Sequence, residues 1–404
     1  MLKAIKVRLY PSQDQENYIA NLLGCCRFAY NSCLDYKIKT YNKTKESVSF
    51  GQIGKHLVQL KQNEETSWLK NVHSKVLQQT LINLEKAYKN FFVNGSGFPK
   101  FKSKHAPKQS CRFPNDAIGK IYGNRINIIK PLKDIHFKCS KRDEKHLNKY
   151  QDKIRSGTLS RTKSGNYYFS ILIDIPTQKE VKESNKQIGL DVGIKDFVVD
   201  SDGKRYENIK IKRNNEKKLA QLHRSVSRKK KGSSNRNKAR IKLAKFYEKL
   251  NNKKEYYLHQ ISNKLIDENQ AIIIEDLNVS GMMKNKNLAR SIQELSLFRF
   301  KEMLTYKAKW HGRDLIQIDR YFPSSKLCSC CGHKNTKLTL NMRQWTCNNC
   351  GMKHDRDHNA AINILNEGKR ILNIGLSSPE LTLGEISPLG QSLNQEKNVI
   401  SCFS

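Results

Sequence analysis

The chain has 404 residues, enough for two or three domains, and 75 Lys and Arg against 37 Asp and Glu give it a formal net charge of +38. Because such an excess of one sign is self-repulsive, we expect a polyanionic partner, with nucleic acid favoured over an anionic membrane surface. No apolar run is long enough to span a bilayer and no signal peptide is recognisable, so we expect a cytoplasmic protein of a prokaryote.

The first half of the chain mixes one strand, a helical region and a group of short strands. Apolar and charged residues alternate over 3–9, which predicts a half-buried strand. Helical spacing follows over 11–92, and a Gly/Pro/Lys loop covers 95–108. Short strands are expected at 125–130 and in a hairpin over 157–175, which has a Lys-Ser-Gly-Asn turn. We expect these strands to pair with the N-terminal strand, so that two separated segments form one small domain.

The second half has the element order of an RNase H-like fold. Apolar runs and a Ser-Asp-Gly turn predict a meander of three strands, which a polar helical region follows. A buried strand, a helix ending at Gly312, another strand and a last helix complete the order β-β-β-α-β-α-β-α. The predicted elements are 187–194, 196–200, 204–211, 212–268, 271–277, 296–312, 314–322 and 359–372.

Three acidic residues lie where an RNase H-like nuclease needs carboxylates. Such an enzyme binds two divalent ions, Mg²⁺ or Mn²⁺, ~4 Å apart, one to activate water and one to stabilise the leaving oxygen. Asp191 is on the first strand, Glu275 ends the fourth, and Asp357 opens the last helix. One such acid is often only a turn residue or a helix cap, but three at fold-consistent positions favour catalysis. Asp276 and Asp355 are neighbours that could substitute, and the pattern alone does not decide between Asp355 and Asp357.

The cysteines predict a structural zinc site. Of the eleven cysteines, five fall between Cys328 and Cys350, which is a metal-site pattern and not a disulfide framework. Two Cys-x-x-Cys-Gly knuckles supply four thiolates, enough to close a tetrahedral site without an open coordination position. The predicted ligands are Cys328, Cys331, Cys347 and Cys350. Cys330 is interpreted as a bystander, and the six cysteines elsewhere as small apolar residues.

The cysteine module is basic, carries Trp345 and lies just before the last predicted helix. Its charge suits contact with nucleic acid, although a solvated surface is the alternative. Its position leads to the hypothesis that zinc fixes the approach of Asp357.

A strongly basic stretch runs from Arg224 to Lys254, with thirteen Lys or Arg and Glu248 as the single acid. An ordinary solvated helix face mixes both signs, so phosphate binding is favoured here. Phe246 and Tyr247 could stack on bases, although such residues more often pack on a core. The predicted nucleic-acid-binding residues are Arg224, Arg228, Lys229, Lys230, Lys231, Arg236, Lys238 and Arg240.

Several motifs together resemble the TnpB family, RNA-guided DNA endonucleases that are encoded by insertion sequences and related to compact type V CRISPR effectors. They are "CRFAYNSCL", "GFPKFKSK", "GLDVGIKDFVVDSDG", "IIIEDLNVSGM" and the block from "SSKLCSCCGHKN" to "WTCNNCGMKHDRDHNAAINIL". The resemblance implies that Asp191, Glu275 and Asp357 are the catalytic, Mg²⁺-binding residues, with Asp357 preferred over Asp355. It also implies that the four knuckle cysteines hold zinc.

The resemblance further implies a guide RNA that pairs with one strand of a double-stranded target DNA, so that pairing supplies specificity. The protein is expected to work as a monomer, to read a short flanking motif with its N-terminal domains and to cut both strands with one RuvC-like site. The expected domains are a wedge-like, β-barrel-like domain (1–10 and 105–185), a helical recognition domain (11–104), a RuvC-like domain (186–325 and 352–374), a zinc ribbon (326–351) and a disordered tail (375–404).

Three other functions are weighed against this one. A transposase of the same fold, acting without RNA, would need a sequence-reading DNA-binding domain, and no clear helix-turn-helix is found. A cleavage-inactive RNA-guided DNA binder would lack one of the acids. A general zinc-ribbon RNA-binding protein would leave the three acids without a role.

Overall fold

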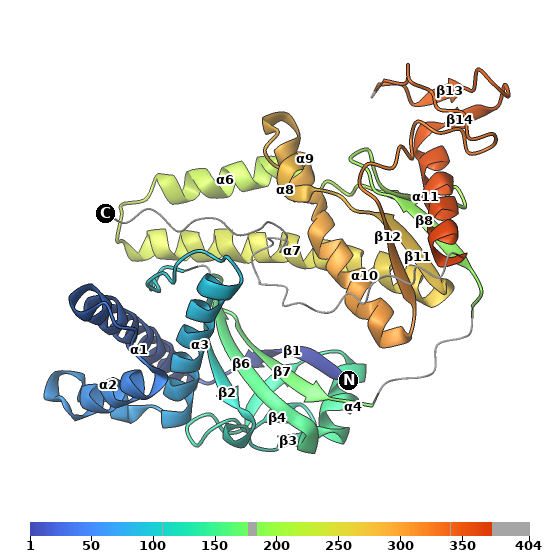
Figure 1. Ribbon diagram of the computed structural model, residues 1–404. Helices are drawn as coiled ribbons and strands as arrows, with labels where there is room; N and C mark the ends of the chain where they lie inside the picture. Colours follow the sequence, from blue (N-terminus) through green and yellow to red (C-terminus); the bar gives the residue numbers. More distant parts are fainter. Residues whose placement is uncertain (107, 177–183, 340, 374–404) are drawn as a thin grey trace. The chain divides into compact units, whose positions relative to one another are not determined.

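The computed structural model describes residues 1–106, 108–176, 184–339 and 341–373, which form two compact units. The first is Met1–Pro176, and the second begins after it (Figure 1). This division lies close to the boundary expected at 185, but the finer domain assignment stays a prediction. The tail expected to be disordered lies outside the described residues. No helix in the described parts of the chain is long and apolar enough to cross a membrane.

The first unit contains an antiparallel sheet, whose strands differ in length, and three long helices. Its strand order is β2-β6-β7-β1-β5-β4-β3. Its elements are β1 (Leu2–Tyr10), α1 (Gln13–Thr44), α2 (Phe50–Gln62), η1 (Glu64–Asn71), α3 (Ser74–Val93), β2 (Lys108–Pro114), η2 (Asn115–Ala117), β3 (Ile121–Tyr122), β4 (Arg125–Ile126), β5 (Ile135–Lys138), α4 (Lys141–Lys149), η3 (Gln151–Lys153), β6 (Ile154–Thr162) and β7 (Tyr167–Asp174).

The predicted pairing of the N-terminal strand with the later strands is confirmed. Ile5, Val7 and Leu9 of β1 are buried, and β1 lies antiparallel between β7 and β5. The predicted hairpin is β6 and β7, and Gly165 takes the left-handed conformation in its turn (φ 85°). The strand expected at 125–130 is shorter, because only Arg125–Ile126 pair. The edge strands β2 and β3 are not paired with each other among the described residues, so closure into a barrel stays a prediction.

The second unit contains a five-stranded mixed sheet of order β10-β9-β8-β11-β12. The meander β8–β9–β10 is antiparallel, whereas β11 runs parallel to both β8 and β12. Its elements are β8 (Gln187–Asp191), β9 (Asp196–Asp200), β10 (Arg205–Glu207), α5 (Ile211–Asn214), α6 (Glu216–Ser227), α7 (Ser234–Glu268), β11 (Ala271–Glu275), α8 (Val279–Met282), α9 (Lys286–Leu295), α10 (Leu297–His311), β12 (Asp314–Ile318), β13 (Gln344–Thr346), β14 (Lys353–Asp355) and α11 (Arg356–Asn373).

The predicted order of strands and helices is confirmed here, with one correction. The helical region expected over 212–268 is not continuous, because α6 ends at Ser227 and α7 begins at Ser234. Gly232 between them has φ 84°, and Ser233 caps α7 by accepting a hydrogen bond from the Arg236 N–H. Ser233 thus starts α7, whereas α6 already ends at Ser227, before Gly232 is reached.

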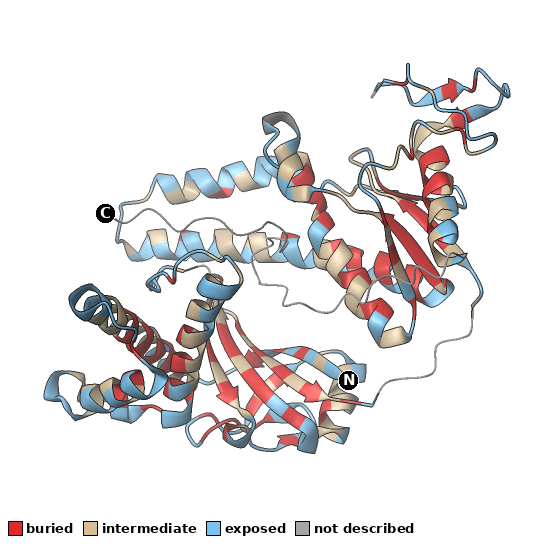
Figure 2. Cartoon of the chain, in the orientation of Figure 1, coloured by how far each residue is buried: buried red, intermediate tan, exposed pale blue. Residues whose placement is uncertain are grey.

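Each face of the central strands β8 and β11 packs against different helices. Even-numbered residues, such as Leu190 and Ile274, belong to a core that includes residues of α7 and α10. Odd-numbered residues of β11, such as Ile273, form a smaller core with Ile364 of α11. Figure 2 shows the buried residues concentrated along these strands and the adjacent side of α11. Since neighbouring residues of a strand face opposite sides, Asp191 and Glu275 face the α11 side.

Two glycines let α11 lie unusually close to the sheet. A Cβ atom on Gly189 of β8 would lie 2.2 Å from the carbonyl oxygen of Ala361, which is in α11. A Cβ atom on Gly368 of α11 would lie 2.3 Å from Cγ1 of Ile273 on β11. Any side chain at these positions would therefore force the helix away from the strands.

Gly189→Ala is accordingly expected to destabilise the second unit by about 1–3 kcal/mol, the usual cost of overpacking. Gly54→Ala in α2 is the matched control, because no heavy atom lies within 4 Å of its Cβ position. Alanine is favoured over glycine inside a helix by roughly 0.5–1 kcal/mol, so the control should be neutral or stabilising. Thermal or denaturant unfolding of the full chain measures both, and an unchanged midpoint for Gly189→Ala would contradict the close packing.

Candidate active site

Asp191 and Glu275 lie side by side at the ends of adjacent parallel strands. Leu190 of β8 is in register with Ile274 of β11, and the two acids are the next residues along each strand. Because side chains alternate between the two faces of a strand, both acids lie on the face that α11 covers. Parallel strands end at the same sheet edge, so the two carboxyl groups meet there without any long loop to position them.

Asp357 approaches the same edge from the first turn of α11. Its charge acts on Asp191, whose pKa is raised to about 8, first by burial and then by the negative charges of Glu275 and Asp357. Arg356 and Arg343 oppose this rise only in part. Burial also raises the pKa of Glu275, although the hydrogen bond from Ser324 lowers it. The structure therefore brings the three predicted acids near one another, and Arg343 balances part of their negative charge by pairing with Asp357.

The two alternative acids make other contacts. Asp355 accepts a hydrogen bond from the His358 N–H at 3.0 Å and forms an ion pair with Arg205 of β10 at 2.8 Å, so it caps α11 and ties it to the meander. Burial raises the pKa of Asp355, but these contacts outweigh it and the pKa is lowered. Asp276 forms ion pairs with Arg320 at 2.5 Å and with Lys301 at 3.3 Å.

Ser324 and two asparagines of α11 connect Glu275 to the cysteine module. The Ser324 hydroxyl donates a hydrogen bond to Glu275 Oε1. The Asn363 amide donates to the carbonyl oxygens of Ser324 (2.8 Å) and Leu327 (2.7 Å). Asn359 donates to Leu327 O at 2.7 Å and accepts from the Ser329 N–H at 2.9 Å. These bonds hold the chain entering the first knuckle against α11. We call the set Ser324, Asn359 and Asn363 the asparagine clamp.

Sequence reasoning missed this clamp and also the contact of Arg343 with Asp357, although it counted Arg343 among the basic residues of the cysteine module. The available signal was the spacing of Asn359 and Asn363, which puts two amides one turn apart on the same face of a helix. Arg343 lies in the loop before β13, and its Nη1 contacts both carboxylate oxygens of Asp357 at 3.2 and 3.3 Å. No local pattern marks that contact, because fourteen residues separate the partners.

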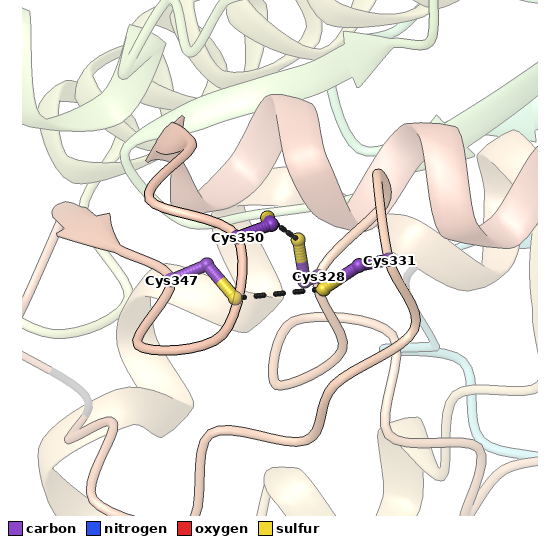
Figure 3. A group of neighbouring side chains, drawn as sticks. All are labelled: Cys328, Cys331, Cys347 and Cys350. Atoms are coloured by element: carbon purple, nitrogen blue, oxygen red, sulfur yellow. Dashed lines mark hydrogen bonds between the residues drawn. The ribbon is translucent and has the colours of Figure 1, made fainter.

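The four knuckle cysteines form a compact cluster (Figure 3). Their Sγ atoms all lie within 4.8 Å of one another, with Cys328–Cys350 at 3.6 Å and Cys331–Cys347 at 3.7 Å. Thiolates bound tetrahedrally to zinc at ~2.3 Å are ~3.8 Å apart, so the cluster could hold that ion. Both knuckles have the same turn: the N–H groups of Gly332 and Gly351 each donate to the carbonyl of the first cysteine at 2.9 Å.

The cysteine cluster and the acidic site each make further contacts. Cys330 is exposed and is not part of the cluster, as expected. His354 Nε2 lies 3.0 Å from Cys328 Sγ, and its ring lies 4.8 Å from that of Trp345. In the described residues the three carboxylates do not form an equally tight group. Ser324 binds Glu275 and Arg343 binds Asp357 instead.

The predicted nucleic-acid-binding residues surround the turn between α6 and α7. Most of them are exposed. Arg236 also has a structural role, because its Nη1 donates to the carbonyl oxygens of Val226 (3.1 Å) and Lys229 (2.9 Å) and so closes the end of α6. Tyr247 bonds to His223 across the two helices (2.8 Å), which supports the packing alternative for this aromatic residue.

Three family models match the chain. They are described as "Cas12f1-like, TNB domain" (residues 298–364), "Probable transposase" (170–286) and "Helix-turn-helix domain" (1–46). The last description differs from the structure, in which residues 1–46 contain the strand β1 and the single helix α1.

Relatives match over most of the chain. A protein of Streptomyces pristinaespiralis, named as a candidate RNA-guided DNA endonuclease, is 36% identical over 91% of this chain and 89% of its own. A protein of Escherichia coli K12 with the same kind of name is 30% identical over 98% and 97%. A TnpB-like protein of Methanocaldococcus jannaschii is 32% identical over 65% of this chain and 97% of its own.

Two solved structures share the fold. Cas12f1 in a complex with sgRNA and target DNA has a TM-score of 0.56 at 14% identity and covers 90% of this chain and 98% of its own. The mini-RNA-guided endonuclease Cas_phi3 has a TM-score of 0.50 at 10% identity and covers 90% and 92%. The fold is thus an α/β fold with mixed sheets, similar to that of Cas12f1. With the relatives above, these findings establish that the chain belongs to the TnpB family of RNA-guided DNA endonucleases.

The raised pKa of Asp191 predicts a pH dependence of stability when divalent ions are chelated. Its pKa is about 8 in the folded chain against an ordinary value of 3.8, so between these values the unfolded chain binds fewer protons at this group. The contribution of this group to the free energy of unfolding therefore falls as the pH rises from about 4 to 8. Asp191→Asn lacks this titrating group. The free energy of unfolding of the variant should therefore increase relative to that of the parent as the pH rises.

Denaturant unfolding at several pH values, with a chelator present, measures this difference. Asp152→Asn, at an exposed aspartate of η3, is the control and should follow the parent at every pH. Curves for the parent and Asp191→Asn that stay parallel between pH 5 and 8 would contradict the raised pKa.

Proposed function

We propose that this chain is an RNA-guided DNA endonuclease in which Asp191, Glu275 and Asp357 are the catalytic residues of one RuvC-like site. The observation that carries the proposal is the meeting of three acids from β8, β11 and α11 at one sheet edge. The strand order, with an antiparallel meander followed by two parallel strands, supports an RNase H-like assignment of the second unit.

The acidic site fits divalent metal ions through its donor set. Carboxylate oxygens are the ligands that Mg²⁺ and Mn²⁺ prefer, and a cation would favour the ionised form of Asp191, whose pKa is raised by burial and then by the charges of Glu275 and Asp357. Asp191, Glu275 and Asp357 would hold the ions. When bound, two such ions supply water activation and stabilisation of the leaving oxygen in phosphodiester hydrolysis.

The protein's own residues prepare this site. Asp191 gives up its proton before it can act as a ligand, so binding of the ions releases a proton below about pH 8. Ser324 orients the Glu275 carboxylate through its hydrogen bond. Arg343 lies against Asp357, where its guanidinium could also contact a phosphate.

The cysteine cluster is proposed to be a structural zinc site that orients α11. The sulfur spacing and the paired Cys-x-x-Cys-Gly turns support zinc. In this proposal the bound zinc orders the cysteine module. The asparagine clamp then positions Glu275, and Arg343 positions Asp357. The hypothesis that zinc fixes the approach of Asp357 extends in this way to a second acid.

Guide RNA and double-stranded target DNA are the proposed partners, and their phosphates account for the net charge of +38. The basic turn between α6 and α7 is proposed to bind phosphate. Reading of the flanking motif by the first unit and action as a monomer in a prokaryotic cytoplasm also stay proposals.

A transposase acting without RNA is the second candidate function. It is favoured by the "Probable transposase" and "Helix-turn-helix domain" descriptions of two matching models. The single helix in residues 1–46 counts against a helix-turn-helix reader of element ends. An inactive guided binder is disfavoured because all three acids are present and converge.

Cleavage by the full chain, co-expressed with the DNA that flanks its gene, tests the proposal. RNA should copurify, and plasmids with the matched target beside a randomised flank should be cut with Mg²⁺ but not with EDTA. Asp191→Asn should slow cutting by at least ~10³-fold, because a metal ligand contributes several kcal/mol to the transition state. Asp202→Asn, in the β9–β10 turn, is the matched control and should cut normally.

The outcomes separate the candidate functions. Bound RNA without cutting would support the guided binder, and the absence of bound RNA would support the transposase. Cutting by Asp191→Asn at the parental rate would show that Asp191 is not part of the active site.

Zinc removal is tested with Cys347→Ser against Cys330→Ser. Cys347→Ser should lose zinc, measured by elemental analysis of the purified chain, and should lose Mg²⁺-dependent cleavage because α11 and Glu275 are misplaced. Cys330→Ser changes an exposed thiol outside the cluster and should keep both properties. Full cleavage by a zinc-free Cys347→Ser protein would contradict the proposed coupling.

A further inference from the structure

The segment from Lys86 to Lys108 in the first unit has an unusual composition. It contains six lysines, four phenylalanines and no acidic residue. It joins the end of α3 to β2, and none of the three matching family models covers it, since they leave residues 47–169 unmatched. The proposed catalytic site and the cysteine cluster use no residue of it.

Several aromatic rings of this segment face solvent. The exposed fraction is 75% for Phe92, 45% for Phe98 and 55% for Phe101. Phe91 lies beneath two of them, with ring centroids 4.9 Å from Phe92 and 5.4 Å from Phe98. Tyr88 supports the same pair at 6.3 and 5.7 Å. Exposed phenylalanines grouped in this way usually mark a binding surface.

The loop that carries Phe98 and Phe101 is held in place. Asn31 of α1 accepts a hydrogen bond from the Lys102 N–H at 2.7 Å, and its amide donates to Lys102 O at 3.0 Å. The Lys102 ammonium lies 3.9 Å from the ring centre of Tyr30, and the Ser96 N–H donates to Asn90 O at 3.1 Å. These contacts fix the loop before any ligand arrives, so less conformational entropy is lost on binding.

The charge around the rings identifies the class of ligand. Lys89, Lys100 and Lys104 are exposed next to these rings in sequence, and no carboxylate of the segment balances them. Aromatic faces combined with uncompensated lysines match the chemistry of unpaired nucleotides, whose bases stack and whose phosphates are anionic. A protein or lipid partner would use the apolar faces but would leave the lysines without a selective role.

Guide RNA is favoured over target DNA by the accessibility of base faces. In a DNA duplex the bases stack on each other and expose only their edges. Structured RNA has loops, bulges and ends whose unstacked bases lie on aromatic side chains. A preformed aromatic surface therefore suits a partner whose loops, bulges and ends carry unpaired bases, which for this protein is the proposed guide RNA.

We propose that the surface formed by Phe92, Phe98 and Phe101 with Lys89, Lys100 and Lys104 binds unpaired nucleotides of the guide RNA by base stacking. This inference rests on the proposed function, because it names the surface that one of its partners contacts. The rings provide the stacking faces, and the lysines contact the intervening phosphates.

Binding of RNA by the full chain, stripped of nucleic acid, tests the stacking. The probes are an oligouridine RNA of ~20 nucleotides and a blunt RNA duplex of the same length. The Phe92→Ala/Phe98→Ala variant should bind oligouridine at least about tenfold more weakly, because each ring stacks on a base. Its affinity for the duplex should change by less than about twofold, since no charge is altered.

The matched control is Phe50→Ala, which removes a ring of α2 that is 47% exposed and lies outside the surface. It should bind both probes like the parent. Phe92→Tyr/Phe98→Tyr keeps two aromatic faces and should restore binding of oligouridine. Unchanged binding of oligouridine by the alanine variant, or an equal loss for the duplex, would overturn the stacking surface.

Ultraviolet crosslinking of the purified particle then identifies the partner. Particles carrying their copurified RNA and a target DNA are irradiated, digested and analysed by mass spectrometry for peptides from residues 86–108 that carry nucleotides. Ribonucleotide adducts are expected. Deoxyribonucleotide adducts alone would assign the surface to DNA, and no adduct on these peptides would overturn the proposal; in either case the RNA-guided function would stand. If no RNA copurifies, the proposed function itself fails.

Discussion

The contact between the backbone of α11 and the strands β8 and β11 is the constraint on which the candidate active site depends. Gly189 and Gly368 remove the side chains that would otherwise separate helix and sheet. The helix can then begin beside the ends of the two parallel strands, and an acid in its first turn joins the acids that end the strands. Three elements far apart in sequence thus share one site because two positions lack a Cβ atom.

The same helix contacts both proposed metal sites. Its N-terminal turn carries Asp357, proposed as a ligand of a hard cation, while Asn359 and Asn363 hold the segment that enters the cysteine cluster. Because the knuckles lie just before the helix, order in the cysteine cluster is proposed to be a condition for order at the acids.

Charge is organised differently in the acidic site and on the basic surfaces. At the sheet edge, burial and then the negative charges of Glu275 and Asp357 raise the pKa of Asp191. Over the rest of the chain positive charge accumulates, at the α6–α7 turn and in the segment before β2. Both arrangements are unfavourable for the protein alone, and the proposed partners, divalent cations at the acids and polyanions at the basic surfaces, would relieve them.

The sequence alone was sufficient to predict the strand–helix order of the second unit and the cysteine cluster, because apolar periodicity and Cys-x-x-Cys spacing are local patterns. The catalytic role of the three acids stays a prediction, which their placement near one another supports. The sequence did not predict the break between α6 and α7, where a few residues determine the helix ends. It also did not predict how short some strands are, because strand length depends on which residues pair with a neighbouring strand. The family resemblance already preferred Asp357 over Asp355, and the tertiary structure added a physical difference: Asp355 caps α11 and pairs with Arg205, whereas the charge of Asp357 acts on Asp191. The tertiary structure alone revealed the asparagine clamp and the partner of Arg343. These contacts join residues that are distant along the chain, and only packing of the helix against the sheet brings such groups within hydrogen-bonding distance.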